Sequence, residues 1–161
     1  MGTMVLFQLP GLNEAIEPLL AGPDDVAETL AFNSSTLILD MDTGLLHPHF
    51  AELDYMEEYV EGPRLAYLMP AKRLQNDRHY AVVVQNTTLA ATPLISEYVA
   101  AYRSGAPGAA LLADLRYIRF RDHVFPLLES RAVDLLKVQV RAYLYVSSYL
   151  HIYLQQCEPV I

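Results

Sequence analysis

The feature that most constrains this fold lies near the C-terminal end, where apolar and polar residues alternate with a period of two. Apart from Ser148, the even positions from 138 to 154 carry Val, Ala, Leu or Ile, and the odd positions carry Gln, Arg, Tyr, Ser or His. This alternation predicts a strand over residues 136–155 with one apolar and one Tyr-rich face. A turn at Ser147-Ser148 would shorten the strand but mix its faces, so one long or bent strand is favoured. A C-terminal helix with Tyr and Leu mixed around it is the alternative.

Between residues 34 and 90, short apolar runs alternate with turn residues, which is typical of antiparallel β-structure. The predicted strands are Thr36–Met41, Leu45–Leu53, Leu65–Met69 and His79–Gln85. Pro48 interrupts the second run, so we expect an edge strand or an irregular crossing there. Asp42-Thr43-Gly44 and residues 75–77 read as short turns, and this spacing suits a sandwich or half-sandwich.

Helical signals surround this β unit. Residues 1–33 read as a helical and loop-like lead-in, with a helix start near Pro23. Thr92 followed by Pro93 predicts a helix that ends at Ser104-Gly105, with Thr92 as its N-cap. An apolar stripe predicts a longer helix over 109–130, bent at Pro126. The expectation is one α+β domain with a small antiparallel β unit at 34–90, helices at 92–130 and a C-terminal strand.

Charge and composition narrow the functional classes. Eleven Lys and Arg against 19 Asp and Glu give a net charge of −8, which disfavours nucleic-acid binding. No apolar run approaches the length of a membrane span, and residues 1–10 lack the pattern of a signal peptide, so we expect a soluble chain. Cys157 is the only cysteine, so an intrachain disulfide is impossible.

The stretch LILDMDTGLLHPHFAELDY at residues 37–55 carries the first candidate chemistry. Asp42-Thr43-Gly44 after an apolar strand resembles the active-site motif of aspartic proteases, which need two carboxylates sharing one proton. Leu45 follows the glycine where those enzymes need a small residue, and no later apolar-apolar-Gly segment follows. A hairpin turn held by Asp42 is therefore the favoured interpretation, with the protease as the less favoured one.

The same stretch offers potential metal ligands. His47 and His49 share one face of an extended strand, and Glu52 and Asp54 follow them. No other Cys or His pair completes a zinc site, and a calcium loop begun at Asp40 or Asp42 lacks its final Glu. We therefore predict polar surface residues, with no metal and no cofactor.

The serines, three further histidines and a run of tyrosines are the remaining candidates for function. None of the serines lies in a Gly-x-Ser-x-Gly motif, and no spacing joins His79, His123 or His151 to a nucleophile. The ladder of Tyr143, Tyr145, Tyr149 and Tyr153 is the candidate face for a partner protein or domain. The alternative is that this ladder packs beneath the predicted 109–130 helix with its hydroxyls at the rim.

A family resemblance rests on three blocks. Leu39–Gly44 followed by Pro48–Asp54 resembles the Asp-x-Asp-Thr-Gly and Pro-His-Phe-Ala-Glu-Leu-Asp blocks of the N-terminal region of secreted bacterial lipase/esterase-like α/β-hydrolases. Met69–Leu74 with Arg78–Val82, and then Tyr98–Gly105, resemble later parts of the same region. Asp40, Asp42, Thr43, Gly44, His49, Glu52 and Asp54 form the shared motif.

The resemblance implies an Ig-like or β-rich accessory region without the hydrolase domain, which in that family supplies the nucleophile later in the chain. In the segment that corresponds to the one leading into that domain, only Ser148 is the residue found in the family. The resemblance implies a non-catalytic domain from a secreted parent. Such a domain packs on or binds another protein or domain, for example a hydrolase domain or a second copy of itself. The alternatives are a weak or degenerate ester hydrolase using Ser148 or Ser104, and the aspartic protease.

Overall fold

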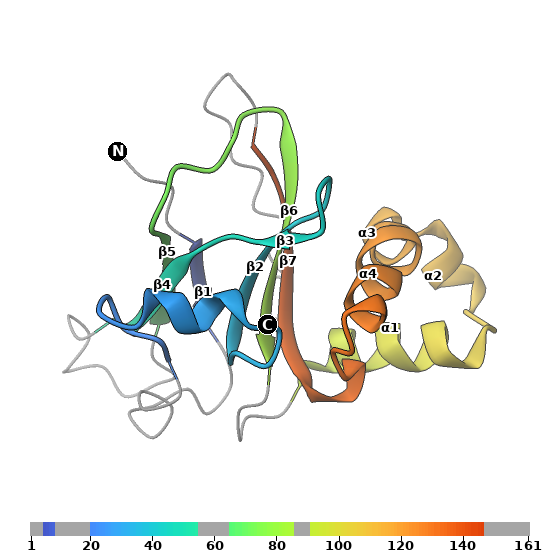
Figure 1. The fold of residues 1–161 in the computed structure, drawn as a ribbon. Helices are drawn as coiled ribbons and strands as arrows, with labels where there is room; N and C mark the ends of the chain where they lie inside the picture. The colour runs from blue at the N-terminus through green and yellow to red at the C-terminus, as the bar shows by residue number, and fades with distance from the viewer. Residues whose placement is uncertain (1–4, 9–19, 55–64, 86–90, 147–161) are drawn as a thin grey trace.

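The computed structural model describes residues 5–8, 20–54, 65–85 and 91–146, and it shows an α+β protein built from antiparallel sheets and helices (Figure 1). One sheet has the order β1-β5-β4, formed by Val5–Gln8, Leu65–Pro70 and His49–Leu53. The other has the order β3-β2-β6-β7, formed by Leu45–Leu46, Thr36–Asp40, Arg78–Gln85 and Val138–Val146. Viewed edge-on, the smaller sheet, the larger sheet and the helices form three layers.

The larger sheet is covered on both faces. On β2, Leu37 and Leu39 pack against the helices, whereas Ile38 packs toward the smaller sheet. On β6, Val83 faces the helices and Val82 faces the smaller sheet. These strands therefore read as continuous apolar runs, because neither face meets water.

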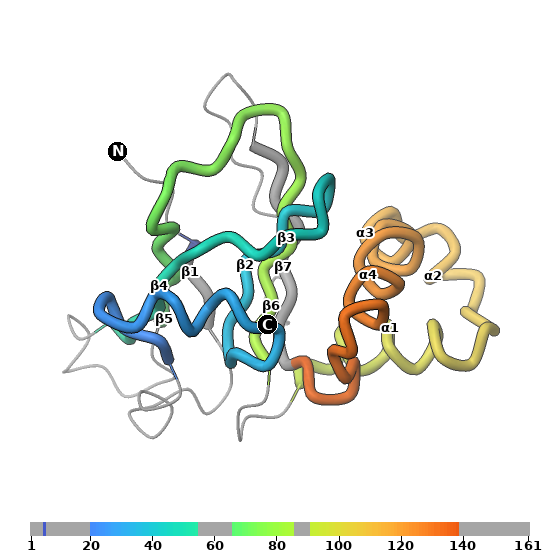
Figure 2. The backbone as a smooth tube through the Cα atoms, viewed as in Figure 1, coloured from blue at the N-terminus to red at the C-terminus, as the bar shows by residue number. Residues whose placement is uncertain are grey.

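The predicted central strands are confirmed, and the segment around Pro48 is indeed a crossing. Leu39 in β2 pairs with Leu46 in β3, whereas Ala51 in β4 pairs with Leu68 in β5. The chain therefore leaves one sheet and enters the other at Pro48, where the missing amide hydrogen disturbs no ladder. The tube in Figure 2 follows this passage between the sheets.

The predicted lead-in at residues 1–33 is wrong in part. Its described portion includes the strand β1, which pairs antiparallel with β5, and the 3₁₀ helix η2 at Val26–Leu30. The four residues of β1 carry no clear local signal, since the strand forms by pairing with a distant segment.

The helical region at 92–130 is confirmed, with α1 at Pro93–Ser104 ending at Gly105 in the left-handed conformation (φ 65°). The expected capping bond is absent among the described residues, because the Thr92 hydroxyl is buried without a partner. The single long helix over 109–130 is wrong. It is divided into α2 at Ala109–Ala113, α3 at Leu115–Arg119, the π-helical turn η3 at Phe120–Val124 and α4 at Phe125–Ser130.

Two local causes explain this division. Asp114 has an extended backbone (φ −81°, ψ 108°), and its side chain accepts a hydrogen bond from the Arg116 amide, which begins a new helix. Pro126 lacks an amide hydrogen, and the Phe125 amide bonds to the Phe120 carbonyl in the π pattern.

The C-terminal alternation forms a strand as far as Val146, after the short 3₁₀ turn η4 at Leu135–Lys137. The helical alternative is therefore wrong for β7. Residues 147–155 of the predicted strand, including the Ser147-Ser148 turn, lie outside the described residues.

Candidate functional site

The Asp-x-Asp-Thr-Gly turn is organised by its first aspartate. One oxygen of Asp40 accepts hydrogen bonds from the amides of Asp42 and Thr43 at 2.9 and 3.1 Å, and its other oxygen lies 2.9 Å from Arg78 Nη1. The Gly44 amide donates to the Asp40 carbonyl at 2.8 Å, with φ at 70°, where glycine is favoured. The prediction that Asp42 holds the turn is therefore wrong, because Asp40 does so.

Asp42 instead fastens the turn to β6. Its carboxylate accepts a hydrogen bond from the His79 amide at 3.0 Å, and its other oxygen lies 3.6 Å from His79 Nδ1. The amide of His79 holds the pKa of Asp42 below its usual value. Thr43 acts locally as well, since its hydroxyl accepts from the Leu45 amide at 3.4 Å. This geometry favours an ionised structural aspartate over a protease dyad, which must share a proton.

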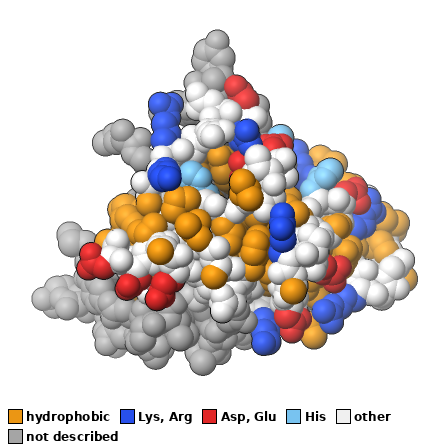
Figure 3. Space-filling view, in the orientation of Figure 1, with side chains coloured by type: hydrophobic (Ala, Val, Ile, Leu, Met, Phe, Trp, Pro, Cys, Tyr) orange, Lys and Arg blue, Asp and Glu red, His pale blue; other side chains and the backbone are white. Residues whose placement is uncertain are grey.

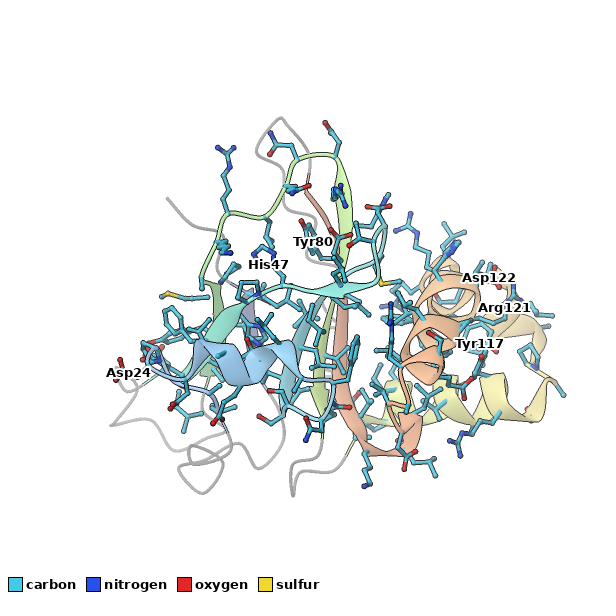
Figure 4. All side chains as sticks on the ribbon, in the orientation of Figure 1. Asp24, His47, Tyr80, Tyr117, Arg121 and Asp122 are labelled. Atoms are coloured by element: carbon cyan, nitrogen blue, oxygen red, sulfur yellow. The ribbon has the colours of Figure 1, made fainter. Side chains whose placement is uncertain are left out.

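His47 and His49 do not converge on a common metal position. His47 Nε2 lies 2.8 Å from the Lys72 carbonyl oxygen, and its ring meets Tyr80 edge-on at 5.9 Å (Figure 4). The next histidine is fully buried in β4 of the other sheet. The expectation that the two histidines share a face is therefore wrong, because the chain changes sheets between them.

His49 joins three segments inside the protein. Its Nδ1 lies 3.0 Å from the His47 carbonyl oxygen and its Nε2 lies 3.0 Å from Thr36 Oγ1, while its amide donates to Thr29 Oγ1 at 3.2 Å. A carbonyl only accepts, so Nδ1 carries the proton and Nε2 accepts from the Thr36 hydroxyl. Burial lowers the pKa of this imidazole to about 4, so it is neutral at pH 7. His49 is thus a buried structural connection, and the prediction of a polar surface residue is wrong for it.

The acidic residues that follow are separate from these histidines. Glu52 accepts a hydrogen bond from the Tyr67 hydroxyl at 2.9 Å, which raises the pKa of Tyr67. Asp54 is half-buried beyond the end of β4. No group of three or more His, Cys, Asp or Glu side chains able to hold a metal ion occurs among the described residues.

Ser104 is the candidate nucleophile that the structure describes, and its hydroxyl makes structural hydrogen bonds. The Ser104 hydroxyl donates to the Ala101 carbonyl at 3.1 Å and accepts from the Ala106 amide at 3.2 Å, which is the role of a helix stop. Ser148, His151 and Cys157 lie outside the described residues.

The predicted tyrosine face is only partly described. Tyr143 stands opposite Ala81 in the register of β6 and β7, and Tyr145 stands opposite His79. The structure describes the backbone at these two positions and not their side chains, and Tyr149 and Tyr153 lie outside the described residues. This partner face stays a prediction.

The helical layer holds polar contacts that the sequence did not predict. The Tyr98 hydroxyl donates to Asp114, the residue that caps α3. Burial raises the pKa of Asp114, but the hydrogen bonds from Tyr98 and Arg116 outweigh it and the net pKa falls. The nearby Tyr117 hydroxyl is buried without a partner among the described residues, and Arg121 pairs with Asp122 at 2.6 Å on the surface (Figure 4).

The surface of this layer carries more apolar side chains than is usual for helices that face water. In α2 only Leu111 is buried, whereas Leu112 and Leu115 are 50% and 69% exposed. Figure 3 shows apolar side chains reaching the surface at this end of the molecule. The sequence carried a signal for this surface, because residues 105–113 contain no charged residue.

Comparison with known proteins adds no relative: no protein-family model, no curated protein and no solved structure matches this chain. The resemblance to lipase/esterase-like hydrolases therefore rests on the sequence motif alone. Within the described ranges, no helix has the length and apolar character needed to cross a bilayer.

Proposed function

We propose that this chain is a non-catalytic interaction domain that binds another protein or domain through an apolar surface on α2 and the start of α3. The observation that carries the proposal is the exposure of this surface, which we call the α2 patch. It consists of Ala109, Ala110, Leu112, Ala113 and Leu115, all of which are exposed.

Helix α2 has no charged residue to present to water. A helix on the surface of a globular protein normally presents charged or polar residues to water. The first charged residue after α2 in the sequence is Asp114, which is half-buried and engaged by Tyr98 and Arg116. Contiguous exposed apolar groups with a polar surround are typical of protein-binding sites. Each leucine buried by a partner would contribute roughly 1–2 kcal/mol to binding.

The candidate catalytic side chains make structural contacts, which supports a non-catalytic role. Asp40 and Asp42 hold a turn and its neighbouring strand, and His49 connects buried segments. Each group has a structural partner that accounts for its position. The less favoured alternatives remain a weak ester hydrolase and an aspartic protease using Asp42.

The proposal also includes the family relationship. We propose that the two sheets correspond to the Ig-like accessory unit of lipase/esterase-like hydrolases from a secreted parent. In this view the tyrosines at 143, 145, 149 and 153 form a second partner face. The motif at residues 39–54 and the face-to-face packing of the sheets support this relationship.

The test changes the α2 patch while leaving the core intact. The wild-type chain is cross-linked to its partner in the native host, the partner is identified by mass spectrometry, and the cross-links are mapped to residues 109–115. We expect the double variant Leu112→Asp with Leu115→Asp to recover no partner. Leu136→Asp is the matched control, since Leu136 is 66% exposed in η4. Equal recovery by both variants, or the absence of cross-links to the patch, contradicts the proposal. Ester or peptide hydrolysis that is lost in Ser104→Ala or Asp42→Asn would instead establish an enzyme.

A further inference from the structure

Strand β7 forms one end of the larger sheet. It pairs on one side with β6, from Val146 opposite Arg78 to Val138 opposite Gln85. Within the described part of the chain, no strand pairs with its other side. Successive residues of an antiparallel strand direct their amide and carbonyl groups to opposite sides, so this outer edge carries a row of hydrogen-bonding groups.

The other strands at sheet ends are short or covered. β3 has two residues and β1 has four. The edge of β4 is met by the chain near η2, where the Ala51 amide donates to the Ala21 carbonyl at 2.9 Å. By contrast, β7 has nine residues without Pro or Gly, and Arg141 is its only charged residue. Its one register shift lies opposite Gln85 near its start, and its register with β6 is regular from Val140 to Val146. Proteins usually protect long edges with Pro, Lys, bulges or a covering segment.

We infer that the outer edge of β7 pairs antiparallel with the β7 strand of a second copy of this chain. The two larger sheets would then join into one continuous sheet across a twofold axis. This inference goes beyond the proposed function of the α2 patch, because it concerns a second surface and names one partner and the bonds that recognise it.

The sequence of β7 suits pairing with itself. A twofold axis normal to the sheet keeps the two faces separate, so the apolar even positions of one copy meet the even positions of the other. The register shift at Gln85 places Val138 on the helix-facing side, so the pairing is considered for the regular part from Val140 to Val146. With the axis at Ala142, Val140 pairs with Leu144 and Ala142 meets its own copy. On the other face, Arg141 stands opposite Tyr143 of the second copy.

The register centred on Arg141 is less favourable. An axis at Arg141 would place two like charges directly opposite each other, which destabilises a strand pair. An axis at Ala142 instead brings the smallest residue of the strand against its own copy. Val82, which stands opposite Ala142 on β6, lies in the core between the sheets. Pairing at this register would therefore continue the apolar face of the sheet across the twofold axis.

The charge of the chain opposes association at low ionic strength. Each copy carries a net charge of −8, so two copies repel each other at long range. Salt screens this repulsion, whereas the backbone hydrogen bonds and apolar pairs are little affected. Association should therefore strengthen as sodium chloride is added.

The experiment uses the full chain in sedimentation equilibrium and hydrogen exchange. We expect a dimer that dissociates on dilution, strengthens with salt, and slows exchange of the β7 amides that do not bond to β6. Arg141→Pro and Ala142→Pro form a matched pair, because the two amides point to opposite sides of the strand. The variant whose amide faces outward should keep the native circular dichroism spectrum and lose the dimer, whereas the other should lose native structure.

Three results would overturn the inference. They are a monomer at every concentration, a dimer that survives in the natively folded proline variant, and outer-edge protection that does not depend on concentration. The last result would mean that the chain itself covers the edge. The pair Leu112→Asp and Leu115→Asp should leave the dimer unchanged, so loss of partner binding through the α2 patch and loss of self-association can be distinguished.

Discussion

Lowering the pH should destabilise this protein through one residue, His49. Its imidazole is fully buried and neutral, and burial lowers its pKa from 6.5 to about 4. Above pH 6.5 neither the folded nor the unfolded chain is protonated at this position, and the full stability is present. As the pH falls from 6.5 to about 4, the unfolded chain takes up a proton that the folded chain refuses, so stability is lost across this window.

The size of the loss follows from the same two values. A difference of one in pKa corresponds to 1.36 kcal/mol, so the complete loss is about 3 kcal/mol. Between pH 7 and pH 5 the linkage relation gives about 2 kcal/mol. Carboxylates such as Asp42 and Asp114, whose pKa values are lowered from 3.8, contribute mainly below this range. The interval from pH 7 to pH 5 therefore isolates the buried histidine from the acidic groups.

The assay is urea denaturation of the wild type and His49→Gln at several pH values in this interval. Glutamine offers an amide donor for the His47 carbonyl and a carbonyl acceptor for Thr36, but it does not titrate. We expect the variant to be less stable at pH 7 and to lose about 2 kcal/mol less than the wild type on going to pH 5. The other histidines are common to both proteins, so their effects cancel in the comparison. Parallel pH profiles for the two proteins would refute the argument.

Three further substitutions and one control test other parts of the structure, each by urea denaturation at pH 7. Asp40→Ala removes two turn hydrogen bonds and an ion pair, and it should cost about 2 kcal/mol; an unchanged midpoint would contradict the role given to Asp40. Gly44→Ala should cost about 1–2 kcal/mol, because φ is 70° and the new methyl group meets Arg131 Nη2 at 3.0 Å. Gly108→Ala is its control, with nothing within 4 Å and a φ of −64°, and it should cost less than Gly44→Ala, because only the N-cap preference for Gly over Ala is lost. Thr92→Val removes a buried hydroxyl that has no described partner and should raise stability by up to about 1 kcal/mol, whereas a loss of stability would indicate a bound water there.

The sequence predicted those elements whose signals are local. Strands β2, β5 and β6 are apolar runs bounded by turn residues, and α1 lies between Thr92-Pro93 and Gly105. Elements determined by distant contacts were missed. Strand β1 forms by pairing with β5, and the break at Asp114 is stabilised by Tyr98, a side chain from another helix. Apolar periodicity does not distinguish one long helix from several short ones that cover the same core.

In the candidate site, too, features with local signals were predicted and features that depend on distant contacts were missed. The turn at Asp40–Gly44 was identified correctly, but the choice between its two aspartates depended on where β6 lies relative to the turn. The spacing of His47 and His49 predicts a shared face only if the strand is continuous. Pro48 was recognised as irregular, but a proline alone does not reveal that the chain passes to another sheet.

The order of strands also bears on how the protein folds. β6 and β7 are neighbours in the sheet, yet the whole helical layer lies between them in the sequence. Their pairing must close a long loop, whereas β2 and β3 are joined by a tight turn and form at a small entropic cost. We therefore expect β7 to dock late, after the helices have collapsed onto β2 and β6, and to detach first when the protein opens. Until it docks, the outer side of β6 is the exposed edge of the growing sheet, so chaperone binding and aggregation during synthesis should concentrate on residues 78–85.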